Sequence, residues 1–146
     1  MSLREWLANR WVTEHRTDKK EIAGMLGAIV RDLSDCSAEG LSSDGRMSIA
    51  YSAALKSAST ALAAVGYRAA REQYHHRVIH SLAYTIELDP ALIMELDQFR
   101  KKRNISTYEA MGMVSDFEAD RMIELAGMLY ERVFAWLMEF HPELCE

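Results

Sequence analysis

The sequence has little of what breaks a helix and little of what cross-links a chain. Its 146 residues include only two prolines, seven glycines and two cysteines, and runs of β-branched residues are absent. Proline and glycine destabilise helix interiors, so their scarcity allows long helices. The apolar runs are also short, because none approaches the roughly 20 residues that a membrane span needs. We therefore expect a helical protein with no membrane contact.

The two cysteines and the N-terminal stretch favour a cytoplasmic protein. Cys36 and Cys145 have no metal-type spacing and lie near the ends of expected segments. A structural disulfide is therefore not expected, and a reducing compartment fits best. The first fifteen residues carry four charged residues among the apolar ones. That is not the pattern of a secretory signal, so we expect none.

The net charge of −5 is spread unevenly along the chain. Residues 67–103 carry seven cations against five anions, whereas residues 104–146 carry two cations against nine anions. The chain as a whole is therefore not a polyanion binder. Any contact with nucleic acid is expected to be local and to involve the middle segment.

Apolar residues recur at helical spacing along almost the whole chain. One long example runs from Met47 to Val65, where apolar positions repeat every three or four residues. We predict an all-α fold, an antiparallel up-and-down bundle of four to five helices that forms a single domain over residues 1–146. A short N-terminal helix is expected at 2–12 and the core bundle at 18–141.

Capping signals set the expected helix boundaries. Typical helix starts stand at three places: Asp18 with Glu21, Asp89 before Pro90, and Ser115 with Glu118. Gly66 predicts a helix end. We expect one helix over about 71–87, another that ends near the basic run 100–103, and a last helix that ends before His141.

The basic run is the first candidate site. It consists of four consecutive cations followed by a polar residue: Arg100, Lys101, Lys102, Arg103 and Asn104. One interpretation is a solvated helix end, where cations complement the negative end of the helix dipole. The other is a phosphate contact, for which the forked guanidinium of arginine is suited.

A second cluster of cations and histidines precedes it. Its members are Arg68, Arg71, His75, His76, Arg77 and His80. His76 and His80 are four residues apart and can reach one metal ion from the same helix face. No carboxylate or cysteine completes a ligand set at a compelling sequence spacing, so we predict no metal and no cofactor. A polar face, a subunit interface or an RNA contact fits the cluster better.

The order of these features resembles the HEPN superfamily, the higher eukaryote and prokaryote nucleotide-binding domains. The likeness covers roughly residues 18–140 and is closest to a bacterial branch of small stand-alone members. The pieces that carry it are Gly66-Tyr67-Arg68, His75-His76, Arg100, Arg103-Asn104 and Tyr108-Glu109.

The resemblance implies a four-helix bundle that pairs as a two-fold homodimer. It also implies a metal-independent ribonuclease, in many members a toxin neutralised by a nucleotidyltransferase-type antitoxin partner. The arginine would hold the phosphate, the polar residue after it would orient the site, and a histidine would assist attack by the 2′-hydroxyl.

The sequence departs from this pattern at the histidine. Tyr108 stands five residues after Arg103, and no register of the motif recovers a histidine. A tyrosine with a pKa near 10 is a poor general base at neutral pH, although it can hydrogen-bond a phosphate or stack on a base. We therefore predict an RNA- or nucleotide-binding protein of a toxin–antitoxin or stress-response type rather than an enzyme.

Two alternatives remain open at this stage. One is an active ribonuclease in which His75, His76 or His80 replaces the missing base. The other is a helical protein–protein interaction module without nucleic-acid binding. The acidic last helix and the small residues from Ala53 to Ala64 suit that second alternative.

Overall fold

The computed structural model describes residues 1–108 and 114–145, with side chains described for residues 1–104 and 114–145. Most of this chain is helical, so the all-α prediction is confirmed in its coarse form. The α-helices are α1 (Leu3–Ala8), α2 (Lys19–Asp35), α3 (Ser43–Ala64), α4 (Tyr74–His80), α5 (Pro90–Tyr108) and α6 (Asp116–Phe140). The described residues also form two 3-10 helices, η1 (Ser81–Ala83) and η2 (Pro142–Leu144). Two short strands are present as well, β1 (Val12–Glu14) and β2 (Tyr67–Ala69).

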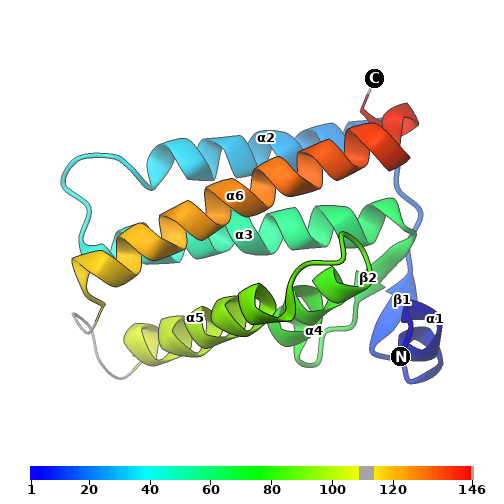
Figure 1. Ribbon diagram of the computed structural model, residues 1–146, viewed down its shortest axis with the longest axis horizontal. Helices are drawn as coiled ribbons and strands as arrows, with labels where there is room; N and C mark the ends of the chain where they lie inside the picture. Colours follow the sequence, from blue (N-terminus) through cyan, green and yellow to red (C-terminus); the bar gives the residue numbers. More distant parts are fainter. Residues whose placement is uncertain (109–113, 146) are drawn as a thin grey trace.

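The four long helices, α2, α3, α5 and α6, reverse direction at each step along the chain (Figure 1). As a result α3 and α6 run in the same direction, and their N-terminal ends meet. Arg46 of α3 bonds to Asp120 of α6 at 2.7 Å, and Ser43 donates to Asp116. The short helices α1 and α4 and the two strands gather at the opposite half of the molecule (Figure 1).

The core lies where α3 packs against α2 and α6. Helix α3 contributes mostly small buried residues, which let its neighbours approach closely: Ala50, Ala53, Ala54, Ala58, Ala61 and Ala63. Helices α2 and α6 contribute larger ones: Ile22, Ile29, Met122, Leu125, Leu129, Val133 and Leu137. The small-residue segment of α3 is thus covered within the chain itself. It is therefore packed against the chain's own helices, although it was one of two features that suited the interaction-module alternative.

The expected helix ends are present where local signals were strong. The Asp18 side chain accepts from the backbone N–H of Glu21 at 2.8 Å, and Ser115 with Glu118 forms a reciprocal capping box. Gly66 adopts a φ of 94°, a left-handed conformation that glycine reaches at little cost, and it ends α3. Helix α6 ends at Phe140, as expected.

The N-terminal helix expected at 2–12 is wrong in its second half. Helix α1 ends at Ala8, and Arg10 has a φ of 63°, which a right-handed helix cannot contain. The chain then forms β1, which pairs antiparallel with β2 so that Val12 lies opposite Ala69. This pairing buries Val12 almost completely. A partner 57 positions away decides the conformation here.

The helix expected at 71–87 is also wrong in its extent. Its start lies three residues later, because Gln73 has a φ of 55° and separates β2 from α4. Its regular part ends at His80, and a left-handed Glu87 then turns the chain into α5. Helix α5, by contrast, continues past the basic run to Tyr108, since no glycine or proline interrupts it there.

Glu95 joins α5 to α6 through an ion pair with Arg121. Its two carboxylate oxygens accept from Arg121 Nε at 2.6 Å and Nη2 at 2.8 Å, a bidentate pair. The hydrogen bond from Arg121 lowers the pKa of Glu95 below its ordinary 4.5, against the opposing effect of burial. The stabilisation is therefore present above the unfolded pKa and is lost as the pH falls through the folded one.

We expect Glu95→Gln to lower the free energy of unfolding at pH 7 by about 0.5–1 kcal/mol, the range of a partly exposed ion pair. The difference from the wild type should be smaller at an acid pH, because the stabilisation is lost as the pH falls through the lowered pKa of Glu95. Urea unfolding at pH 7 and at that acid pH measures it. Glu131→Gln, an exposed change of the same kind on α6, serves as the control. A deficit that is equal at both pH values would contradict the ion-pair account.

Candidate nucleic-acid interface

A cavity of about 600 Å³ lies between the α4 region and α5. It is lined by Arg71, Gln73, Tyr74, His75, His76, Arg100 and Asn104. The two clusters predicted separately from the sequence therefore contribute to one site. Arg71, His75 and His76 come from the second cluster, and Arg100 and Asn104 come from the basic run.

The local backbone explains why these residues face each other. Left-handed Gln73 turns the chain between β2 and α4, so that Arg71 and His75 reach the cavity from the two sides of that turn. On α5, Arg100 and Asn104 are four residues apart and share a helix face. The site therefore depends on a turn that helical periodicity does not indicate.

Asp97 is a buried carboxylate behind the cavity, and it is 6 % exposed. Arg100 Nε donates to its Oδ1 at 2.8 Å, and Lys101 Nζ lies 3.7 Å from Oδ2. His76 Nδ1 and His80 Nε2 stand 3.5 and 3.6 Å from Oδ1. Burial raises the pKa of Asp97. The hydrogen bond and the charge of Arg100 act in the opposite direction and outweigh burial, so the pKa lies below its ordinary value. Asp97 is therefore ionised and fixes Arg100 beside the cavity.

His75 is held by a different partner. Its Nδ1 lies 3.1 Å from the hydroxyl of buried Tyr51. Burial raises the pKa of Tyr51 to about 12, so the phenol stays protonated. Burial also lowers the pKa of His75 below 6.5, and the charges of Arg103 and Arg100 act in the same direction. The imidazole is therefore mostly neutral at pH 7.

The rest of the basic run is directed elsewhere. Arg103 Nε lies 3.4 Å from Ser48 Oγ, and its guanidinium carbon stands 5.4 Å from the centre of the Tyr51 ring. Lys102 pairs with Glu118 at 3.1 Å, and Lys101 is 65 % exposed. Tyr108 ends α5, but its side chain lies outside the described residues, as does Glu109.

Three members of the second cluster do not line this cavity. The guanidinium carbon of Arg77 stands 3.8 Å from the centre of the Trp11 ring, a cation–π contact that packs α4 against the segment before β1. His80 faces Asp97. Arg68 belongs to a second cavity.

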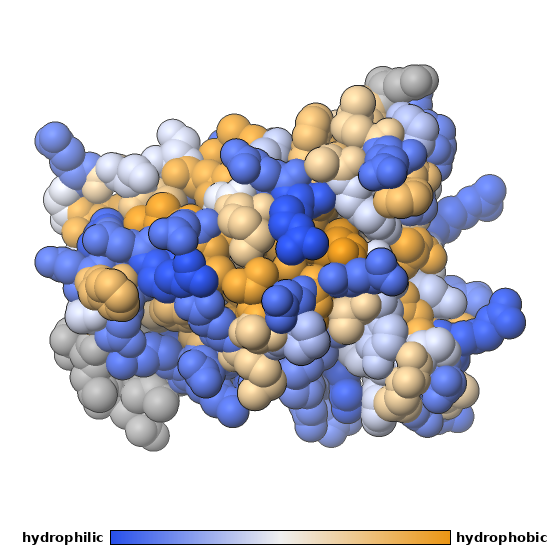
Figure 2. Space-filling view, in the orientation of Figure 1, coloured by the Kyte–Doolittle hydropathy of each residue, from blue (hydrophilic) through white to orange (hydrophobic). Residues whose placement is uncertain are grey.

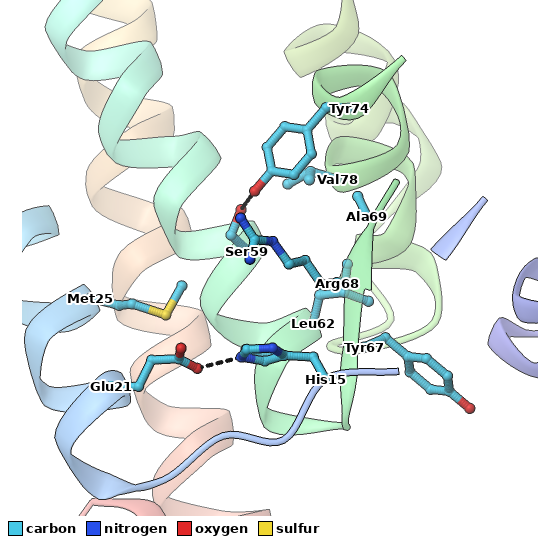
Figure 3. Close-up of a pocket in the computed structure, with 11 residues that line it drawn as sticks. His15, Glu21, Met25, Ser59, Leu62, Tyr67, Arg68, Ala69, Tyr74 and Val78 are labelled. Atoms are coloured by element: carbon cyan, nitrogen blue, oxygen red, sulfur yellow. Dashed lines mark hydrogen bonds and ion pairs between the residues drawn. The ribbon is translucent and has the colours of Figure 1, made fainter. Parts of the chain in front are cut away.

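That second cavity, of about 250 Å³, lies between α2, α3, β2 and α4 (Figure 3). The Arg68 side chain extends across it toward Ser59, while Met25, Leu62 and Val78 supply apolar walls (Figure 3). His15 and Glu21 bond to each other at 2.7 Å along one side. Arg68 and the carboxylate of Glu21 line the same cavity, so the positive charge there is partly balanced. This cavity is therefore less suited to a polyanion than the one between α4 and α5.

The face of the molecule that carries α6 is not uniformly polar. Figure 2 shows hydrophobic residues in its middle, with hydrophilic ones around them and toward the end where α5 finishes and α6 begins. Helix α6 exposes several large apolar side chains: Phe117, Phe134, Met138 and Phe140. This face therefore combines an apolar middle with hydrophilic surroundings.

Sequence reasoning missed three residues that shape the site: Asp97, Gln73 and Tyr51. Asp97 lies three residues before Arg100, which is an ion-pair spacing on a helix and the one local signal available. Tyr51 lies within the apolar repeat from Met47 to Val65, and its hydroxyl partner His75 is 24 residues away. Gln73 has no local feature that indicates a left-handed backbone.

The chain matches no protein-family model, and no curated protein or solved structure matches it either. Within the described residues, no helix combines the length and the apolar character needed to cross a membrane.

Proposed function

We propose that the protein binds RNA or a nucleotide through the cavity between α4 and α5, as a HEPN-like protein. The observation that carries the proposal is the convergence of Arg71, Arg100, His75, His76 and Asn104 on one cavity. Arginine forks match phosphate oxygens, an asparagine amide adds a donor, and histidine rings stack on bases. All of these groups suit a phosphate-bearing, single-stranded ligand.

The electrostatics of the site support the same proposal. Asp97 neutralises part of the local positive charge, but it is buried behind the cavity and already bonded to Arg100. Arg71 is exposed and stands at the rim. The ligand-facing side of the cavity is therefore cationic, although the chain as a whole is acidic. Toxin–antitoxin or stress-response roles follow from the HEPN resemblance alone.

A metal-independent ribonuclease is the second candidate, favoured by the place of His75. The expected catalytic position holds Tyr108, but His75 lines the cavity together with Arg100 and Asn104. If Nδ1–H donates to the Tyr51 oxygen, Nε2 keeps its lone pair and can accept a proton from a 2′-hydroxyl. Arg100 would then hold the phosphate that is attacked.

Protein partners are part of the proposal as well. The resemblance implies a homodimer and an antitoxin of the nucleotidyltransferase type. Phe134 and Met138 support a partner contact, because they are exposed and lie one turn apart on α6. Sedimentation velocity measures the dimer directly, and a single monomer-sized species at every concentration would contradict it.

One test of this proposal concerns the affinity of the protein for RNA. We expect Arg71→Gln to weaken binding of a fluorescein-labelled single-stranded RNA about tenfold, because one charge-assisted hydrogen bond is lost. The slope of log affinity against log salt should also fall by about 0.7, the value of one phosphate contact on a single strand. Fluorescence anisotropy over a range of salt concentrations measures both.

Arg132→Gln is the matched control, since Arg132 is exposed on α6, outside the cavity lining, and the change removes the same charge. If the two variants bind equally, the cavity is not the binding site. If the wild type shows no salt-sensitive binding, the interaction-module alternative is favoured instead.

Another test distinguishes a ribonuclease from a protein that only binds RNA. If the ribonuclease proposal holds, purified wild type cleaves RNA in the presence of EDTA, and His75→Gln slows cleavage at least about 100-fold, the usual contribution of a general base. His141→Gln is the control, because His141 packs on Trp136, away from the cavity. RNA that is bound but left intact by the wild type rules out the nuclease and leaves the binding proposal in place.

A further inference from the structure

His76, His80 and Asp97 form a cluster of three side chains that the proposed function does not use together. One ligand atom from each, His76 Nδ1, His80 Nε2 and a carboxylate oxygen of Asp97, lies within 4.8 Å of the other two. The sequence offers no carboxylate at a ligand spacing from the two histidines. The fold supplies one from α5, across the contact with α4.

From this geometry we infer that His76, His80 and Asp97 bind a divalent transition metal of the zinc type. Zinc binds imidazole nitrogen and carboxylate oxygen at about 2.0–2.2 Å in a tetrahedral arrangement, which separates neighbouring ligand atoms by about 3.3 Å. The two separations to Asp97 Oδ1 are 3.5 and 3.6 Å. These two separations are close to that value, and all three ligand atoms lie within 4.8 Å of one another.

An unsatisfied polar atom supports the inference independently. His80 Nε2 is buried and has no hydrogen-bond partner among the described residues. Its distance of 3.6 Å to Asp97 Oδ1 is too long for a hydrogen bond. A buried ring nitrogen that makes no hydrogen bond costs free energy. A metal ion at this position would give the nitrogen a ligand role and remove that cost.

Arg100 is compatible with this role of Asp97. Its Nε donates to Asp97 Oδ1 and takes one lone pair of that oxygen. Carboxylates that bind metals commonly accept a hydrogen bond from outside the ligand set, and this bond orients them. The positive charge of Arg100 lowers the affinity for a cation, but the two imidazoles and the carboxylate provide three of the four positions of a tetrahedral site.

The cluster adjoins the cavity between α4 and α5, because His76 is one of the residues that line it. Three protein ligands leave a fourth position for water or for an anion in the cavity. The inference does not rest on RNA binding, because it concerns the metal alone.

The test is a calorimetric titration of the untagged, chelator-stripped full chain with Zn²⁺ alone. We expect one Zn²⁺ per chain. Asp97→Asn and His80→Gln should each weaken binding by at least about 100-fold, since loss of a supporting outer-shell partner alone costs 10–100-fold. His141→Gln removes a histidine outside the cluster and should bind Zn²⁺ as the wild type does.

Co²⁺ gives a second readout that stability effects do not imitate. Co²⁺ in a tetrahedral site absorbs strongly in the visible range, and we expect that band in the wild type and in His141→Gln but not in His80→Gln. Circular dichroism identifies any variant that fails to fold, and the remaining variant then carries the comparison. The absence of saturable binding by the wild type, or equal affinity in His80→Gln and the wild type, would overturn the inference.

Discussion

The buried carboxylate of Asp97 is the interaction on which the candidate site depends. An ionised side chain excluded from water is tolerated when charged or polar partners surround it. Asp97 has the cations Arg100 and Lys101 on its own helix, and the imidazoles of His76 and His80 on α4 lie 3.5 and 3.6 Å from its Oδ1. This one group therefore holds the short helix α4 against α5 and fixes the guanidinium of Arg100. The cavity exists in its present form because these two helices are joined there.

Neighbouring cations of the basic run differ in what they can do, because they have different partners. Arg100 is fixed by Asp97 beside the cavity, Lys102 is paired with Glu118 of α6, and Arg103 reaches back to α3. Four consecutive cations on a helix point in different directions, so a run of charge is not a single binding surface. Arg71, which lies outside the basic run, is the more exposed of the two arginines that line the cavity.

Much of the fold could be predicted from the sequence, because it is encoded locally. The capping residues Asp18 and Ser115, the left-handed Gly66 and the apolar spacing of α3 and α6 each act within one or two helical turns. The small sheet could not be predicted in this way. Val12 and Ala69 pair across the chain, and the turn at Gln73 has no local signature. Both features shorten helices that periodicity alone extends.

The candidate site follows the same division. Its residue types, the arginines and histidines of the two clusters, were evident in the sequence, and the family resemblance emphasised several of them. Their grouping was not evident, because Asp97, Tyr51 and the turn before α4 select which ones converge. Arg77, for example, has the charge to bind phosphate, but it packs on Trp11 instead. Burial and distant partners, rather than composition, decide which side chains remain available to a ligand.

We propose that a phosphate-bearing ligand binds in the cavity between α4 and α5. The most direct measurement is a two-dimensional NMR titration of the isotope-labelled chain with a short single-stranded RNA. It should follow both the backbone amides and the arginine Nε–H groups. We expect saturable chemical-shift changes concentrated at five residues: Arg71, Gln73, His75, Arg100 and Asn104. Shifts confined to α6, or no saturable shifts at all, would contradict it.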